Sequence, residues 1–299
     1  MISRARLIRM AGAMLGRLPR VVDPVLWSIA GVVSYLGNER RRNTVRRNQR
    51  LALLSRSGVG GLKKWQLELS VYRAFYFYAR YWVEVLRIQS LSPEEVVLAV
   101  DLVNADEFVA RRMAKEPTIA ILAHVGNWEW GGAWVSLACN GVMAVAEALE
   151  DEGMTEWFLT ARQRLGMEIV LTGGDVVRSL LKGLRHGKLV ALVVDRDVSG
   201  TGEMVDFLGT RVPLSGGPGV ISVMSGVPIY PVGTFQRRSG RQEVRFYPPI
   251  YPPTDGTRAD RVAEVMKQVA VAIEKIVKEE PGQWHNFQDY DAVTERGMA

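Results

Sequence analysis

The second half of the chain alternates short apolar runs with longer amphipathic segments. Six runs of four to eight residues are rich in β-branched and small apolar side chains, a composition typical of buried strands. Between and after them, apolar residues recur at helical spacing. This alternation predicts an α/β fold in which a central mixed β-sheet is flanked by helices. The expected strands are residues 118–124, 142–147, 168–171, 189–195, 228–235 and 243–248, and the expected helices are residues 128–139, 152–165, 174–186, 215–226 and 258–279.

The N-terminal part follows a different pattern. Residues 4–20 interleave arginines with leucine, isoleucine and methionine, which is typical of a basic amphipathic helix. Residues 25–37 are mostly apolar and predict a helix, but a bilayer-spanning helix needs a longer run of roughly 20 residues. More arginines follow at 40–50, and residues 62–88 predict a long helix rich in aromatic side chains.

The excess positive charge is confined to this N-terminal part. The whole chain carries a net charge of +6, whereas residues 1–50 contain 11 arginines and only two acidic residues. This distribution argues against a nucleic-acid-binding protein, and it favours helices that lie on an anionic membrane surface. We therefore predict a membrane-associating helical segment at 1–55 and the α/β domain at 56–299. The alternative is that residues 25–37 form a core helix and that the arginines are simply solvated.

Several common kinds of site are absent from the sequence. With one cysteine, Cys139, and three scattered histidines, we expect no disulfide and no metal site. There is no G-x-S-x-G nucleophile motif, no phosphate-binding P-loop and no G-x-G-x-x-G dinucleotide motif. We also find no cleavage site of a signal peptide, so the apolar residues near the N-terminus are not interpreted as one.

His124 stands where a predicted buried strand passes into a predicted helix, within HVGNWEWGG. Gly126 allows a positive φ or a close backbone approach, and Asn127 is a good N-cap residue. Glu129 then falls in the first helical turn. Because ligands bind at the carboxyl ends of strands in open α/β sheets, we predict that His124 is a general base.

The acid that orients His124 is left open by the residues alone, since Glu129 or another carboxylate could hold the ring. The N–H groups at the helix start are expected to stabilise developing negative charge. The alternative is a structural histidine that is simply hydrogen-bonded. In that case Glu129 would only compensate the helix dipole.

Two further polar clusters accompany this motif. Asp195 and Arg196 follow another apolar strand, so they are expected at the same sheet edge as His124, next to the flexible stretch SGTG, which contains Thr201. Arg162 and Arg164 end a predicted helix and could bind an anionic group such as a phosphate. In the alternative interpretation, the first cluster is a loop-closing salt bridge and the arginines compensate a helix dipole.

The ordered set of motifs resembles the glycerolipid acyltransferase superfamily. H-x-x-x-x-[DE], here His124 to Glu129, is that superfamily's signature. HVGNWEWGG is similar to the branch of lipid A late acyltransferases and actinobacterial phosphatidylinositol mannoside acyltransferases. YARYWVEVLRI, RQRLG with LTGGD, DRDVSGTGEMVDFLG and PGQWHNFQ resemble the mannoside group, and the similarity extends over nearly the whole chain from about residue 40.

This resemblance implies roles for particular residues. In the family, a histidine deprotonates an acceptor hydroxyl, which attacks the thioester of an acyl-CoA. His124 would be that base, with Asp195 within its reach. Arg162, Arg196 and Thr201 become candidates for binding coenzyme A phosphates or the thioester region. The mannoside branch tends to carry Asp five residues after the histidine and Glu before Arg-Asp, whereas here Glu129 and Asp195 are exchanged.

The resemblance also implies a function and a location. We expect transfer of a long-chain acyl group, such as palmitoyl from palmitoyl-CoA, to a mannose hydroxyl of phosphatidylinositol mono- or dimannoside. Acyl-CoA would be a co-substrate and no cofactor is expected. The protein would be peripheral, at the cytoplasmic face of the cell membrane. The alternatives are acylation of a lipid A-type glycolipid, a hydrolase in which His124 activates water, and a non-catalytic lipid-binding membrane protein.

Overall fold

The central sheet contains seven strands within the described part of the chain. The computed structural model describes residues 3–57, 61–197, 200–288 and 290. The strands lie in the order β1–β9–β8–β2–β5–β3–β4, and every neighbouring pair is parallel except the antiparallel pair β8–β9. The predicted mixed sheet is therefore confirmed. The strands are β1 (Val100–Val103), β2 (Thr118–Leu122), β3 (Val142–Ala146), β4 (Met167–Leu171), β5 (Leu189–Val193), β8 (Ile229–Gln236) and β9 (Gln242–Phe246).

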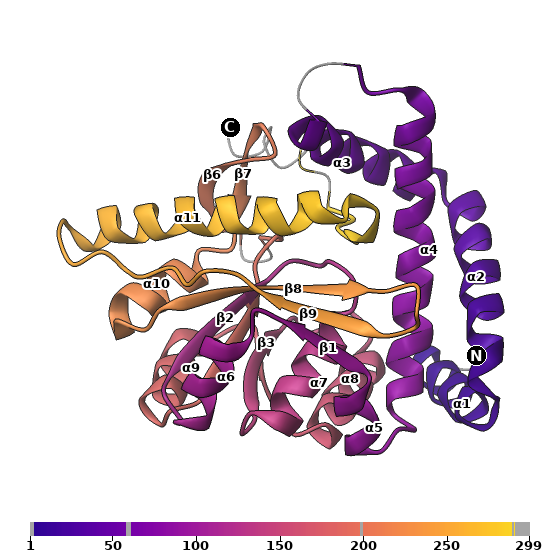
Figure 1. Cartoon of the computed structure of the whole chain (residues 1–299), viewed down its shortest axis with the longest axis horizontal. Helices are drawn as coiled ribbons and strands as arrows, with labels where there is room; N and C mark the ends of the chain where they lie inside the picture. The colour runs from indigo at the N-terminus through magenta and orange to yellow at the C-terminus, as the bar shows by residue number, and fades with distance from the viewer. Residues whose placement is uncertain (1–2, 58–60, 198–199, 289, 291–299) are drawn as a thin grey trace.

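Helices cover both faces of this sheet (Figure 1). The alternation along β2 separates two cores: Ile119 and Ile121 pack with α9, α10 and α11, whereas Ala120 and Leu122 pack with α5, α6 and α7. All five residues of β2 are buried, as expected for a central parallel strand. These helices are α5 (Pro93–Leu98), α6 (Asp106–Met113), α7 (Trp128–Ala138), α8 (Glu152–Arg164), α9 (Val176–Arg185), α10 (Gly217–Ser225) and α11 (Arg258–Glu279), which is followed by the short helix η2 (Pro281–Gln283).

Three strands were not predicted from the sequence. β1 has only four residues at the sheet edge, and two of them are exposed. The other two, β6 (Glu203–Phe207) and β7 (Thr210–Leu214), form a separate antiparallel hairpin. Its turn, Leu208-Gly209, has positive φ at both residues, and a leucine is an unusual residue for that conformation. The missing turn signal explains why the hairpin was overlooked.

The N-terminal helices form a layer against one long helix. α4 (Lys64–Ile88) passes beside the sheet, and α1 (Arg4–Arg17) and α2 (Asp23–Gly37) pack on its far side (Figure 1). α3 (Glu39–Ser57) also contacts both α4 and α11. A buried ion pair between Arg87 and Asp23 joins the layer to α4, and Arg87 also donates to the carbonyl oxygen of Leu15.

The outer surface of this layer is apolar. Val25, Ile29, Val33 and Leu36 recur at helical spacing along α2 and are exposed. Within the described residues, no single helix combines the length and apolar character of a membrane span. The bent pair Arg20–Gly37 and Glu39–Arg56, with 99° between its halves, reaches that length and composition only when taken together.

Candidate active site

The turn from β2 into α7 carries His124 and is shaped by a glycine. Gly126 has φ of +61°, and a Cβ atom there would lie 2.1 Å from the carbonyl oxygen of Thr234 on β8. Any other residue would therefore be strained and would clash with the backbone. Both expectations for Gly126, a positive φ and a close backbone approach, are confirmed. The turn brings His124 to the carboxyl edge of the sheet.

Asn127 occupies the predicted N-cap position, but its side chain does not cap the helix. It makes no hydrogen bond to the first turn of α7, and its Nδ2 instead donates to Oε2 of the buried Glu84 on α4, over 2.9 Å. Glu84 also accepts from Arg80 and Gln236. The capping interaction predicted for Asn127 is therefore wrong. A tertiary contact has replaced it and ties the turn to α4.

His124 is held by Asp195. Its Nδ1 lies 2.7 Å from Oδ1 of Asp195, and its backbone N–H donates to the same oxygen over 3.1 Å. A carboxylate only accepts, so Nδ1 carries the hydrogen and Nε2 is left with its lone pair available. Asp195 is completely buried, whereas the His124 side chain is about 20% exposed. The arrangement presents a base to solvent and hides the acid that orients it.

The ionised form of Asp195 is favoured in spite of its burial. Burial by itself would raise the pKa of this carboxyl group, but the charge of His124 and hydrogen bonds from His124 and Trp284 hold the pKa below its ordinary value. The indole Nε1 of Trp284 donates to Oδ2 over 2.8 Å. Both carboxylate oxygens therefore have a donor, and the orientation of the carboxylate is fixed.

Trp284 belongs to a C-terminal segment, residues 281–288 together with Tyr290, that packs along the His124 turn. His285 donates its backbone N–H to the carbonyl oxygen of His124 over 2.7 Å, and its Nε2 lies 3.1 Å from the carbonyl oxygen of Gly126. Asn286 and Tyr290 donate to the carbonyl oxygen of Asp195. Burial, together with the nearby His124, lowers the pKa of His285 to about 3. His285 is therefore neutral at physiological pH.

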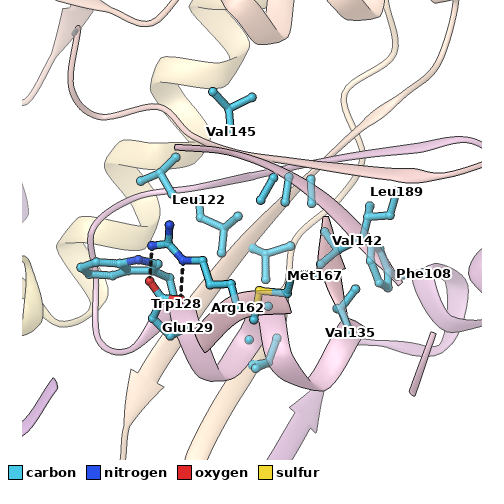
Figure 2. Close-up of a pocket in the computed structure, with 18 of the residues that line it drawn as sticks. Phe108, Leu122, Trp128, Glu129, Val135, Val142, Val145, Arg162, Met167 and Leu189 are labelled. Atoms are coloured by element: carbon cyan, nitrogen blue, oxygen red, sulfur yellow. Dashed lines mark hydrogen bonds and ion pairs between the residues drawn. The ribbon is translucent and has the colours of Figure 1, made fainter. Parts of the chain in front are cut away.

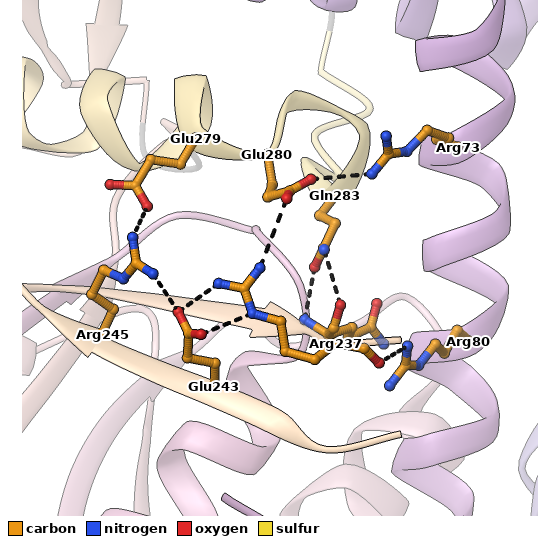
Figure 3. A network of polar contacts seen from close by, with 9 residues as sticks. Arg73, Arg80, Arg237, Glu243, Arg245, Glu279, Glu280 and Gln283 are labelled. Carbon is orange, nitrogen blue, oxygen red and sulfur yellow. Dashed lines mark hydrogen bonds and ion pairs between the residues drawn. The ribbon is translucent and has the colours of Figure 1, made fainter. Parts of the chain in front are cut away.

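A network of ion pairs fixes the start of this segment (Figure 3). Glu280 pairs with Arg73 on α4, 3.1 Å away, and with Arg237 after β8, 3.7 Å away. Gln283 accepts from the backbone N–H of Gln236 and donates to its carbonyl oxygen. The segment is thereby fastened to both α4 and β8 before it reaches Asp195.

Glu129 does not contact His124 in the described hydrogen-bond network. Its two carboxylate oxygens accept from Nε and Nη2 of Arg162, 3.0 and 2.5 Å away, and Tyr81 lies within 3.4 Å of one of them. Burial opposes the charge on Arg162, but Glu129 more than compensates, so the pKa of Arg162 is raised. The question that the sequence left open is answered by geometry: Asp195 contacts the imidazole, and Glu129 forms a separate bidentate pair.

A narrow apolar slot lies between the sheet and α7 (Figure 2). Its floor includes Ala120, Ala191 and Ala144, which stand side by side on β2, β5 and β3 because their register aligns them. Opposite them, Gly131 and Gly132 of α7 also lack bulk. Small side chains on both walls keep this space open between helix and sheet.

The slot runs from the His124 site into the core. Trp128, Glu129 and Arg162 line one end, and Phe108 lies at the other, next to Phe246 (Figure 2). The ring of Trp128 meets that of His124 edge to face, with centroids 4.9 Å apart. Trp128 thus joins the base to one end of this largely apolar space. Among the tryptophans of α7, Trp128 borders the slot, whereas Trp130 and Trp134 belong to the surrounding core.

A family model described as bacterial lipid A biosynthesis acyltransferase matches residues 8–290. The chain belongs to this family. The matched span holds the whole sheet, His124, Asp195 and the C-terminal segment up to Tyr290.

Similar proteins carry the name phosphatidylinositol mannoside acyltransferase. The protein is 31% identical over 219 residues to proteins named phosphatidylinositol mannoside acyltransferase in two strains of Mycobacterium tuberculosis, and 27% identical over 214 residues to one in Mycolicibacterium smegmatis. These matches cover 71% of this chain, and 66% and 68% of the relatives' lengths. The predicted resemblance to this group is confirmed.

The two remaining candidate residues, Arg196 and Thr201, lie at the same edge of the sheet as the His124–Asp195 pair but at some distance from it. Arg196 is exposed and lies 4.0 Å from Glu147, which follows β3. Thr201 is exposed on the loop that begins at Asp197, whose carboxylate accepts from the backbone N–H groups of Gly200 and Gly202. Residues 198 and 199 of the SGTG stretch lie outside the described residues. The roles of both side chains in binding remain predictions.

The residues that hold Asp195 were not singled out by chemical reasoning on the sequence. PGQWHNFQ entered only through the family resemblance, and no role was assigned to Trp284, His285 or Asn286. The available signal was a short segment, dense in hydrogen-bonding side chains, directly after the last amphipathic helix. Within the described part of the chain, no group of three or more histidine, cysteine, aspartate or glutamate side chains is placed so that it could hold a metal ion.

Proposed function

We propose that the protein is an acyltransferase that moves a long-chain acyl group from acyl-CoA to a mannose hydroxyl of phosphatidylinositol mannosides. The observation that carries this proposal is that the buried Asp195 orients a partly exposed His124, whose ring contacts Trp128 at one end of an apolar slot. Family membership and the names of the relatives support the reaction class and the acceptor. A lipid carrier has no need of an oriented base, whereas a hydrolase would use the same base on water and is distinguished by its independence of the acceptor.

The proposed reaction uses one base and no covalent enzyme intermediate. Nε2 of His124 takes the proton of the acceptor hydroxyl as its oxygen attacks the thioester carbonyl carbon. The oxyanion that forms would lie near the backbone N–H groups of Trp128 and Glu129 at the start of α7, whereas that of Trp130 already donates to the carbonyl oxygen of Asn127. Collapse breaks the C–S bond, and the proton on His124 passes to the leaving thiolate. Asp195 stays ionised and stabilises the transient imidazolium.

The acyl chain would enter the slot with its carbonyl beside His124, and because the slot measures about 90 Å³ in this structure, α7 and the sheet would have to move apart to hold a whole palmitoyl chain. Replacing Ala191 by leucine puts a larger side chain in the middle of the alanine row and blocks the inner half of the slot. We expect Ala191→Leu to transfer short acyl chains as well as the wild type does, but to lose palmitoyl transfer. Ala138→Leu, on α7 but outside the slot lining, is the matched control. Equal loss for all chain lengths would contradict this placement of the chain.

The first test follows thiol release from palmitoyl-CoA with and without phosphatidylinositol mannosides, with mass spectrometry of the lipid product. Release should require the acceptor and should disappear in His124→Ala. His186→Ala is the control, because His186 is exposed and lies after α9, away from Asp195. Release that ignores the acceptor would indicate hydrolysis. Transfer to a lipid A-type glycolipid but not to mannosides would correct the acceptor.

Membrane association at the cytoplasmic face belongs to the same proposal. The exposed apolar row of α2 lies next to the arginines of α1 and α3, a combination that favours anionic membrane surfaces. We expect Ile29→Asp with Val33→Asp to abolish flotation with anionic vesicles while thiol release from soluble substrates persists. Val271→Asp is the control, because Val271 is equally exposed but lies on α11. Flotation unchanged in the double variant would remove α2 from the membrane-binding surface.

A further inference from the structure

A second cavity lies on the opposite side of α8 from the apolar slot. This groove is bounded by α1, the C-terminal end of α4 and α8, and its volume is about 530 Å³, within the roughly 300–1,000 Å³ typical of ligand pockets. On α8, Phe158 and Arg162 contact each other on the slot side, whereas Trp157 and Ala161 line the groove. The two cavities therefore share α8 as a wall.

The groove is open because α1 is poor in side-chain bulk on this face. Gly12, Ala13 and Gly16 line it, all within about one helical turn. A Cβ atom at Gly16 would lie 3.2 Å from the Cβ of Ser90, so the glycines also let α1 approach α4 closely. The floor is apolar, formed by Ile8, Leu86, Trp157 and Ala161.

Two arginines line the groove without an acidic partner. Arg9 of α1 and Arg164 of α8 make no ion pair within the described part of the chain. The family resemblance makes Arg162 a candidate for binding phosphates, but its guanidinium is engaged by Glu129. Arg164 is the one left available. Two unpaired guanidinium groups above an apolar floor suit a phosphodiester attached to a hydrocarbon chain.

The other polar groups narrow the class of ligand. Glu156, Gln89, Ser90 and Thr160 line the same groove. Their carboxylate, amide and hydroxyl groups can accept from or donate to the hydroxyls of a polyol. A choline headgroup offers no such hydroxyls. The exposed Met10 and Met14 of α1 lie beside the groove, so a lipid could enter directly from the membrane surface.

We propose that this groove is a second lipid site, which binds the phosphate and polyol headgroup of an anionic phospholipid of the phosphatidylinositol class. Arg9 and Arg164 bind the phosphate, and Glu156 accepts from the headgroup hydroxyls. The proposal goes beyond acyl transfer and does not depend on His124. The ligand is either the phosphoinositol group of the acceptor itself or a separate membrane lipid. A kinetic experiment distinguishes these two sources.

The test uses full-length His124→Ala protein without acyl donor, titrated with monomeric dioctanoyl phosphatidylinositol by calorimetry. Arg9→Gln with Arg164→Gln should weaken binding at least about tenfold, because two charge-assisted contacts to phosphate are lost. Arg6→Gln with Arg17→Gln removes the same charge from exposed positions outside the groove and should leave the Kd within about twofold. Ala13→Trp, which fills the groove without changing charge, should also abolish binding.

The outcomes separate the site from general electrostatics. Equal weakening in both arginine pairs, or binding unchanged in Ala13→Trp, would overturn the proposal. Dioctanoyl phosphatidylcholine binding as tightly as the inositol lipid would overturn the assignment of the headgroup. If the protein binds phosphatidylinositol but does not transfer acyl groups to mannosides, the second lipid site is supported and only the proposed function is rejected.

A kinetic experiment on protein with an intact His124 identifies the source of the lipid. If the acceptor's own phosphate occupies the groove, the Arg9→Gln, Arg164→Gln variant should raise the KM for phosphatidylinositol mannoside about tenfold with kcat little changed. If a separate lipid occupies it, the KM should stay constant, and added phosphatidylinositol should still bind. Both results support the site, whereas a loss of kcat alone would contradict a binding role.

Discussion

Two carboxylates stand at the same edge of the sheet, and their surroundings give them different tasks. Asp195 follows β5, is fully buried, and receives donors from His124 and from the C-terminal segment. Glu129 stands in the first turn of α7 and forms a bidentate pair with Arg162 at the slot mouth. The residues alone offered Glu129 as one possible partner of the histidine and left another carboxylate open. The distant Asp195 holds that place.

The difference shows what a short motif can and cannot specify. In H-x-x-x-x-E, the glutamate lies on a helix that starts after the turn, and Arg162 of α8 engages both its oxygens. Parallel pairing of β2 with β5 instead brings the residues after both strands together. Adjacency in the sheet, rather than adjacency in sequence, therefore selects the acid that orients the base.

The largest expected effect tests Asp195 directly. Asp195→Asn removes the charge that stabilises the imidazolium and favours the wrong imidazole tautomer, so kcat should fall on the order of 10³-fold or more, as in comparable acid–histidine pairs. Thiol release in the presence of the acceptor measures this. Asp101→Asn, at an exposed aspartate paired with Arg241, is the control. An effect below tenfold would mean that Asp195 does not act through His124.

In contrast to Asp195, Glu129 should contribute more to the stability of the fold than to kcat. Glu129→Gln leaves the charge of Arg162 poorly compensated in a largely buried site, so the protein should lose roughly 3 kcal/mol of unfolding free energy. At a temperature where the variant is folded, kcat should fall less than about tenfold, because His124 keeps its acid. Urea denaturation and kinetics on the same preparation separate the two effects. A loss of kcat as large as in Asp195→Asn would erase the distinction between the carboxylates.

Much of the fold was predictable because its signals are local. All six expected strands and the helices that follow them occur within a few residues of their predicted bounds. β1 and the β6–β7 hairpin were not predictable, because they are short and their burial depends on partners distant in sequence. Among the site residues, strand ends predicted His124 and Asp195, whereas hydrogen bonds across more than 80 residues, such as Trp284 to Asp195, leave no pattern in the sequence.

Trp284 sharpens the comparison, since in the described hydrogen bonds Asp195 has a donor from the C-terminal segment, whereas Glu129 accepts from Tyr81 and Arg162. Trp284→Phe keeps an aromatic ring but removes the donor to Oδ2 of Asp195, so kcat should fall about 10- to 100-fold, as expected for a lost hydrogen bond to a charged group. Trp130→Phe is a matched control, because Trp130 is also buried but its Nε1 has no hydrogen-bond partner within the described residues. Equal losses in both variants would reduce the role of Trp284 to packing.

The smallest expected effect concerns His285, which packs on the turn between the two carboxylates. Burial lowers its pKa in the folded protein to about 3, whereas an unfolded histidine titrates near 6.5. Between these values the unfolded state binds the extra proton, so stability falls as the pH falls. From about pH 6.5 to about pH 5.5, the wild type should lose about 1 kcal/mol more unfolding free energy than His285→Gln. Urea denaturation at both pH values measures this, and parallel losses would show that His285 is protonated in the folded state.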